Sequence, residues 1–267
     1  MDVEERAQRH SRQLRMVDIG PTGQRRLADA RVLVVGCGGL GTPVIEQLAA
    51  AGVGHLTVVD DDTVEVSNLN RQVLHRSEDI GRKKAERAAE WVRALDPALS
   101  VEPLVRRIGV HDARELVRAY TLVVDCTDGL PAKFLLNDAC VLENVPLVHG
   151  AATGFSGQVL LVPGRSGPCL RCLFEDVPPP GTVPTCQEAG VLGATCGLVG
   201  SLMSLEAIKH LAGLGGGGGR FLVVDAKGPD IRSLRLARRD DCAACGDEPE
   251  VDARTPDDYV PGACVSG

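Results

Sequence analysis

The chain has 267 residues, of which 44% are hydrophobic and 3% aromatic, and its formal net charge is −7. This length suits one large domain or two small ones, and no apolar run approaches the roughly 18 residues of a membrane span. The acidity argues against unspecific binding to nucleic acid, which needs a basic face, and the few aromatics disfavour base stacking.

Residues 1–30 are charged and are expected to form a helical arm ahead of the main fold. The first five residues are acidic and lack the apolar core of a signal peptide, so we expect a cytoplasmic protein. Arg6, Arg9, Arg12 and Arg15 repeat at a spacing of three. From the residues alone, a solvated helix face is the better explanation for most of these arginines.

Residues 32–35 are all apolar and predict a strand that is buried on both faces. The strand runs into the motif Gly36-x-Gly38-x-x-Gly41, a segment rich in Ala and Leu follows, and a second apolar strand ends on Asp60. In a nucleotide-binding β-α-β unit the glycines let the backbone approach phosphate, and the acid meets a ribose hydroxyl. The pattern therefore favours a nucleotide site over an ordinary glycine turn, without naming the nucleotide.

A helix is predicted to begin at Gly81-Arg-Lys-Lys84, because apolar residues then recur at helical spacing. Cations in a first turn are unfavourable, since the helix dipole favours anions there. Two explanations stay open from the residues. Either Glu78 and Asp79 compensate the charge, or an external anion such as a triphosphate completes it.

Residues 121–125 form another apolar run, and the acids Asp125 and Asp128 follow at its end. Ligands of open α/β sheets bind beyond the carboxyl ends of the strands, so both acids are expected at the same edge as the glycine loop. Carboxylates beside a triphosphate hold magnesium. The alternative for Asp128 is a turn-forming role ahead of Gly129.

The rest of the chain continues the alternation of strands and helices. Strands are predicted at 101–108, 146–150, 157–163, 221–225 and 231–236, and helices at 111–119, 133–144 and 192–211. Leu198, Leu202, Leu205 and Ile208 line one face of the last helix. We thus expect an arm at 1–30, a nucleotide-binding core at 31–165, a continuation of the same domain at 166–246 with a long loop up to residue 190, and a disordered tail at 247–267.

Ten cysteines in a chain without a secretion signal suggest metal or thiol chemistry. The pairs Cys169/Cys172 and Cys242/Cys245 together offer the four thiolates of a tetrahedral, structural zinc site. Redox activity is the competing explanation, and the loop positions of both pairs favour zinc. Cys186 precedes a helix, where a thiol has a lowered pKa, so it is as readily a nucleophile as an incidental residue.

These motifs together resemble the ThiF/MoeB/HesA family, bacterial relatives of ubiquitin-activating enzymes. The resemblance extends from about residue 9 to residue 245 and is carried by Arg12-Gln13, Gly36 to Gly41, Ala51 to Gly54, Asp60, Asn68-Leu-Asn-Arg71-Gln72, Lys84, Asp125 to Asp128 and both C-x-x-C pairs. It implies a Rossmann-like α/β fold with a doubly wound, mostly parallel sheet, a C-terminal antiparallel extension and a structural zinc knuckle.

The resemblance also implies a reaction. The protein would bind ATP and magnesium, adenylylate the C-terminal glycine of a small ubiquitin-like sulfur carrier protein ending in Gly-Gly, and release pyrophosphate. A separate sulfur donor, either a sulfurtransferase or a cysteine desulfurase, would then convert the acyl-adenylate to a thiocarboxylate. The sequence does not name the carrier or choose between thiamine, molybdopterin and other pathways.

By the resemblance, most of the motif residues contact the nucleotide. Gly39 lies over it and Asp60 holds the ribose. The phosphates are steered by Asn68, Arg71 and Lys84, and magnesium is bound by Asp128.

Two further roles follow from the family. Cys186 matches a loop cysteine that some members use for a covalent sulfur or thioester step and others do not need. Arg12 would reach the ATP phosphates of the partner subunit in a two-fold homodimer. Three rival functions remain: a nicotinamide dehydrogenase, an inactive scaffold subunit, and an adenylating enzyme acting on a tRNA or peptide.

Overall fold

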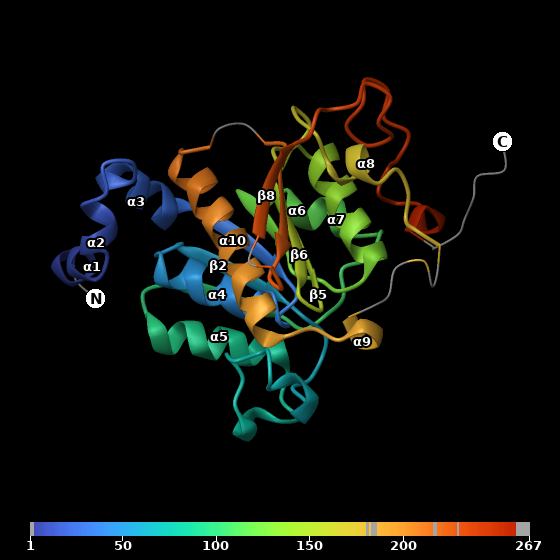
Figure 1. Cartoon of the computed structure of the whole chain (residues 1–267). Coiled ribbons are helices and arrows are strands. Elements are labelled where there is room, and N and C mark those ends of the chain that lie inside the picture. Colours follow the sequence, from blue (N-terminus) through green and yellow to red (C-terminus); the bar gives the residue numbers. More distant parts are fainter. Residues whose placement is uncertain (1–2, 180–181, 183–185, 216–217, 229, 260–267) are drawn as a thin grey trace.

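The computed structural model describes residues 3–179, 182, 186–215, 218–228 and 230–259, and one eight-stranded sheet runs through it (Figure 1). The strand order is β3-β2-β1-β4-β5-β6-β7-β8. The first five strands in this order are parallel, and the last three are added antiparallel. The strands are β1 (Arg31–Val35), β2 (His55–Val59), β3 (Ser100–Leu104), β4 (Leu122–Asp125), β5 (Leu147–Thr153), β6 (Ser156–Val162), β7 (Arg220–Asp225) and β8 (Asp230–Arg235).

Helices cover both faces of this sheet. The helices are α1 (Val3–Arg9), α2 (Ser11–Leu14), α3 (Gly20–Asp29), α4 (Gly41–Ala50), α5 (Lys84–Leu95), α6 (Ala113–Val117), α7 (Leu130–Leu142), α8 (Leu170–Leu173), α9 (Cys186–Ala189) and α10 (Gly193–Ala212), with 3-10 turns η1 (Val66–Asn68), η2 (Ser77–Asp79) and η3 (Pro256–Tyr259). One core cluster joins α3, α4, α5 and α10 to the sheet, and a second joins α6, α7 and α8 to the other face.

Strand β1 shows why the sheet needs both layers. Its side chains alternate between the two faces, as in any strand. Val32 and Val34 belong to the core cluster with α4 and α10, whereas Leu33 and Val35 belong to the cluster with α7. The predicted doubly wound, mostly parallel sheet with an antiparallel C-terminal extension is therefore confirmed. Among the described residues, no helix is long and apolar enough to cross a membrane.

Helix α10 packs through a narrower surface than its leucines suggest. Leu198 and Leu205 are 37% and 51% exposed, whereas Val199 and Met203 are fully buried. A Cβ placed on Gly200 would lie 2.3 Å from Cγ of Pro43 in α4, so only the small-residue face of α10 can approach that helix closely. The leucine face expected from spacing exists, but its outer members point to solvent.

The tail differs from expectation up to residue 259. Ala253 and Tyr259 are buried, and the Tyr259 hydroxyl donates a 2.9 Å hydrogen bond to Oδ2 of Asp138 in α7. Arg114 donates to the backbone oxygen of Asp252 as well. The prediction of disorder from residue 247 is therefore wrong for this part, because an aromatic side chain and backbone acceptors dock on α6 and α7. Cys264 lies outside the described residues.

Candidate active site and cysteine cluster

The glycine loop joins β1 to α4 in a conformation that only glycines allow. Gly36 has φ +97°, in the left-handed region that L side chains rarely adopt. A Cβ on Gly41 would lie 1.9 Å from the Gly36 carbonyl oxygen, so the first turn of α4 is pressed against the end of the strand. A Cβ on Gly38 would meet only Gln72 Nε2, at 3.6 Å, which leaves the backbone open to a ligand.

Asp60 and His75 hold the loop through the backbone of Cys37. The Cys37 N–H donates a 2.7 Å hydrogen bond to Asp60 Oδ2, and His75 Nε2 lies 3.2 Å from the Cys37 carbonyl oxygen. Burial lowers the pKa of His75, so its imidazole is neutral and donates from Nε2. Asp60 also accepts from the Asp62 N–H, yet a carboxylate has about four acceptor positions, so capacity for a ribose hydroxyl remains.

Lys84 lies at the start of α5, only 6% exposed. Its Nζ is 3.0 Å from Oδ2 of the exposed Asp62, two residues beyond Asp60. Arg82 pairs with Glu90 on the same helix. The three-cation turn is thus partly balanced within the chain, and Lys84 stands close to the edge where Asp60 meets the glycine loop.

Of the two explanations left open, compensation by Glu78 and Asp79 is not seen among the residues that the structure describes, since neither acid pairs with Arg82, Lys83 or Lys84. The structure pairs Glu78 with Arg76 and Asp79 with Arg87 instead. The physical reason is that both carboxylate oxygens of Asp79 are already engaged, Oδ2 by the backbone N–H of Arg76 in the turn η2 and Oδ1 by Arg87.

Arg71 and Asn68 come from the segment between β2 and α5. A Cβ on Gly39 would lie 3.6 Å from Arg71 Cδ and 2.9 Å from Cys196 Sγ, so Arg71 and the start of α10 flank the loop. Arg71 Nη1 donates to the Ser67 carbonyl at 2.8 Å, and its guanidinium keeps further donors for an anion. Asn68 is buried and accepts the Glu65 N–H, a local bond that shapes this segment.

Asp128 lies exposed in the turn after β4. This turn touches the glycine loop, because a Cβ on Gly36 would lie 2.7 Å from the Cys126 carbonyl oxygen and 3.2 Å from Thr127 N. Asp128 is therefore at the predicted edge. No partner for its carboxylate is recorded among the residues that the structure describes.

Asp125 ends β4 beside Val35, the last residue of β1, so its backbone lies at the expected edge, but its carboxylate is buried beneath that edge. Its side chain is fully buried and points toward α7 and β5, where Lys133 and His149 contact it. Burial alone would raise the pKa of Asp125, but Lys133, His149 and Thr127 together hold it well below its ordinary value. Burial lowers the pKa of His149, which is therefore neutral and donates from Nδ1.

Arg12 is not brought to the glycine loop of its own chain. It is exposed on α2, next to a part of the arm that docks at the amino ends of the strands. Arg9 donates to the Leu95 carbonyl at the end of α5, and a Cβ on Gly52, just before β2, would lie 2.7 Å from His10. His10 thus lies near the amino end of β2, whereas the glycine loop lies at the carboxyl ends of β1 and β2. These strands have five residues each, so the two ends are roughly 17 Å apart.

Cys186 begins the short helix α9, and its side chain lies outside the described residues.

The four cysteines of the C-x-x-C pairs meet in one cluster, on the α7 face of the sheet and away from the glycine loop. Their sulfurs all lie within 4.8 Å of one another, with 3.6 Å between Cys169 and Cys242 and 3.3 Å between Cys172 and Cys245. A tetrahedron of zinc–sulfur bonds of about 2.3 Å has edges of about 3.8 Å, so the cluster fits zinc if the sulfur–sulfur distances change by no more than about 1 Å.

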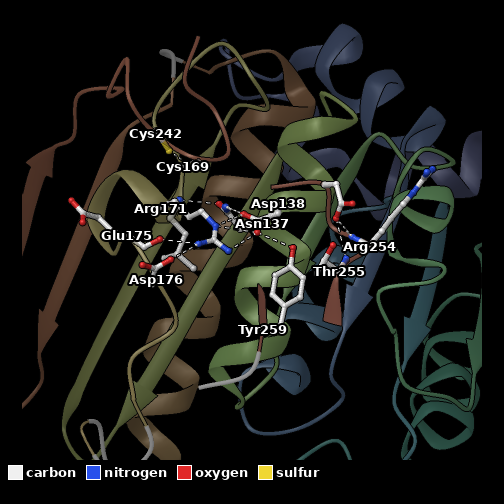
Figure 2. A network of polar contacts seen from close by, with 12 residues as sticks. Asn137, Asp138, Cys169, Arg171, Glu175, Asp176, Cys242, Arg254, Thr255 and Tyr259 are labelled. Atoms are coloured by element: carbon white, nitrogen blue, oxygen red, sulfur yellow. Dashed lines mark hydrogen bonds and ion pairs between the residues drawn. The ribbon is translucent and has the colours of Figure 1, made fainter. Parts of the chain in front are cut away.

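A buried polar network lies beside the cluster (Figure 2). Arg171, between the first two cysteines, is 3% exposed and donates to both carboxylate oxygens of Asp138 at 2.9–3.0 Å. The same guanidinium donates to the Glu175 carbonyl at 2.8 Å. Asn137 accepts the Leu170 N–H at 2.8 Å. The network therefore ties α7 to the cysteine segment and to the root of the loop that follows it.

Sequence reasoning missed Asp62, His75, Lys133 and His149. Lys133 carried one usable signal: it is a lone cation in an apolar helix, and a buried cation needs an acid. The other residues contact partners that are distant in the sequence, so no local sequence pattern indicates these contacts.

The sequence and the fold are similar to those of known proteins. Residues 10–244 match the sequence profile of the ThiF family. The SAMP-activating enzyme E1 of Haloferax volcanii is 48% identical over 260 residues, covering 97% of this chain and 95% of that protein. The sulfur carrier protein adenylyltransferase of Thermus thermophilus is 48% identical over 253 residues, covering 92% and 93%.

Two further matches cover less of the other protein. The adenylyltransferase and sulfurtransferase MOCS3 of Bos taurus is 49% identical over 249 residues, and the match covers 92% of this chain but only 55% of that protein. Among solved structures, Escherichia coli MccB superposes with a TM-score of 0.78 at 22% identity, covering 90% of this chain and 73% of MccB, a likeness of fold.

Proposed function

The chain belongs to the ThiF family, and on that premise we propose that it transfers AMP from ATP to the C-terminal carboxylate of a small ubiquitin-like sulfur carrier protein ending in Gly-Gly. The carboxylate attacks the α-phosphorus, a new carboxyl–phosphate bond forms, and pyrophosphate leaves. The observation that carries the proposal is the meeting of the glycine loop with Asp60, Arg71, Lys84 and Asp128 at one edge of the sheet.

Each of these residues has a role that its surroundings permit. Asp60 accepts a ribose hydroxyl while keeping its bond to the Cys37 N–H. Arg71 and Lys84 place positive charge beside the phosphates, which offsets the repulsion between an attacking carboxylate and a triphosphate. Asn68 shapes the segment that carries Arg71. The backbone N–H groups at the start of α4, with Gly38 and Gly39, face the phosphates.

Asp128 fits a magnesium ligand. Its carboxylate is exposed at the same edge, and magnesium takes one or two carboxylates together with phosphate oxygens. When bound, the ion supplies positive charge for the departing pyrophosphate. We also infer that the four-cysteine cluster holds one structural zinc ion, since four thiolates in a closed arrangement suit that metal.

The adenylated carrier then becomes a substrate for sulfur transfer. A separate sulfurtransferase or cysteine desulfurase would supply a persulfide, whose terminal sulfur attacks the adenylated carbonyl and displaces AMP to give an acyl disulfide. A second thiol would then break the S–S bond, so that the thiocarboxylate leaves and a disulfide remains. Cys186 is the candidate for a covalent intermediate in this later step.

In this proposal, Arg12 of one subunit contacts the ATP phosphates in the site of the other subunit. Because its arm docks at the amino ends of the strands, Arg12 cannot serve the loop of its own chain. In a two-fold dimer the arm of one subunit can instead complete the site of the other. The exposed Leu198 and Leu205 on α10 offer apolar surface for such an interface.

Exchange of labelled pyrophosphate into ATP tests the reaction. We expect exchange that depends on a carrier protein with an intact Gly-Gly end and stops when the last glycine is removed. Exchange that ignores the carrier, or requires a tRNA or peptide instead, would contradict the proposal. Oxidation or reduction of a nicotinamide cofactor in place of exchange would favour a dehydrogenase.

Subunit mixing tests the shared site. Arg12→Ala and Asp128→Ala should each be nearly inactive alone. After subunit exchange, half of the dimers are mixed and each regains one site of two, so activity should return to about a quarter of wild type. A fully active Arg12→Ala protein, or no recovery after confirmed exchange, would contradict the shared site.

A further inference from the structure

The buried acid Asp125 is the hub of a small charged cluster below the turn that carries Asp128. We propose that Asp125, Lys133, His149 and Thr127 act as positioning residues that hold this turn in the geometry needed for the metal. The inference rests on the proposed magnesium-binding role of Asp128.

The Asp125 carboxylate accepts four hydrogen bonds from groups of its own chain. Oδ1 accepts the Thr127 N–H at 3.0 Å and the Thr127 hydroxyl at 2.7 Å. Oδ2 accepts from Lys133 Nζ at 3.2 Å and from His149 Nδ1 at 2.9 Å. Lys133 donates in addition to the Gly150 carbonyl at 2.7 Å. A carboxylate thus joins β4, α7 and β5 at one point.

These bonds fix the chain on both sides of Asp128. Thr127 directly precedes Asp128, and its N–H and hydroxyl are both tied to Asp125. Lys133 lies in the first turns of α7, which begins two residues after Asp128. The backbone can therefore move at Asp128 only if a bond to Asp125 breaks.

The cluster is poorly explained as a stabilising device. A buried ion pair loses its hydration, and apolar residues of similar volume often serve stability as well or better. His149 Nε2 is buried and has no partner among the described residues, which adds a further cost. Residues around a metal ligand that fix its orientation commonly determine the affinity for the metal, so a positioning role accounts for a cluster of this kind.

Matched pairs of variants separate positioning from packing. Thr127→Val keeps the shape of the side chain and removes the hydroxyl donor, whereas Thr127→Ser keeps the donor. His149→Leu removes the donor to Asp125, whereas His149→Asn keeps an N–H close to the place of Nδ1. If His149→Leu fails to fold, the half-buried Thr127 pair still tests the proposal.

The readout is binding of Mn²⁺, as a spectroscopic substitute for magnesium, to the protein saturated with a non-hydrolysable ATP analogue, measured by electron paramagnetic resonance. We expect Thr127→Val and His149→Leu to weaken Mn²⁺ binding about 10- to 100-fold, with Thr127→Ser and His149→Asn close to wild type. The half-saturating magnesium concentration for pyrophosphate exchange should rise in parallel.

Unchanged Mn²⁺ affinity in both disruptive variants, with or without a lower melting temperature, would overturn the positioning role. Asp128→Asn distinguishes this from failure of the premise. If Asp128→Asn binds Mn²⁺ and the analogue like wild type, the magnesium role of Asp128 is wrong. If it loses Mn²⁺ while the Thr127 and His149 variants do not, only the positioning role is wrong.

Discussion

The network around Arg171 and the edge around the glycine loop use charge in opposite ways. Arg171 is buried, and its three nitrogens all donate to Asp138, Glu175 or Asp176 within the chain. Among the described residues at the loop, Asp128 is exposed and has no partner, and Arg71 bonds only to Ser67 and Asn70 in its own turn. Removing one partner of a buried, saturated ion pair destabilises the fold, whereas exposed groups with spare donors and acceptors can bind a ligand. Substitutions on the two sides should therefore separate stability from activity.

Loss of zinc should have the largest effect of all. Chelation or Cys172→Ser is expected to lower the free energy of unfolding on the order of 5 kcal/mol, less than the ~10–16 kcal/mol of zinc-finger peptides because the sheet has its own core. Metal analysis should give one zinc per chain, and thermal melts with and without added zinc measure the loss. Freshly purified protein without zinc would contradict the site.

Arg171→Met should cause the next largest loss of stability, because it leaves the Asp138 carboxylate buried without its cation. We expect a loss of about 3–5 kcal/mol in denaturant unfolding. Tyr259→Phe removes a single hydrogen bond to the same carboxylate and should cost about 1.5 kcal/mol, which makes it the matched control. An Arg171→Met protein as stable as Tyr259→Phe would show that the network does not stabilise the fold.

Asp128→Asn should lower the activity of the protein and leave its stability unchanged. The change keeps size and removes the charge that holds magnesium, so carrier-dependent pyrophosphate exchange should fall on the order of 100-fold, equivalent to about 3 kcal/mol. The melting temperature should not change, because the side chain is exposed. Exchange at the wild-type rate would remove Asp128 from the mechanism.

Cys186→Ala should have the smallest effect on adenylylation. AMP transfer to a carboxylate needs no thiol, so exchange should stay within about twofold of wild type. Formation of the carrier thiocarboxylate, followed by mass spectrometry, should fall only if the thiol acts in the sulfur step. Loss of exchange in a well-folded protein would mean that this segment serves the first step instead.

The central strands were predictable because they are short runs buried on both faces. Strand β3 was not: it was expected to reach residue 108 but ends at Leu104. Its only neighbour among the strands that the structure describes is β2, and Leu104 pairs with Val59, the last residue of that strand. The length of an edge strand is thus decided by a partner that the local sequence does not contain. In α10, the small residues Gly197, Gly200 and Ser201 predict close packing, which Gly200 makes against Pro43, but the sequence does not show that Leu198 and Leu205 stay exposed.

In the candidate site, the predictable part is the part held by local backbone geometry. The motif around Gly36 and the acid at Asp60 come together because two adjacent parallel strands end at the same edge. The pairing of Asp125 with His149 depends on a strand 24 residues away, and no periodic pattern encodes it. This is why the sequence places Asp125 at the edge correctly but does not predict that its carboxylate is buried beneath it.

The cysteine cluster has a consequence for the order of folding. One pair follows β6 and the other follows β8, so α10 and the last two strands must be in place before four sulfurs can meet. Closing so long a loop costs entropy that two sulfurs alone cannot offset. If the cluster holds zinc as proposed, we expect the metal to bind late, after the transition state of folding. Loss of the metal should accordingly speed unfolding and leave the refolding rate nearly unchanged.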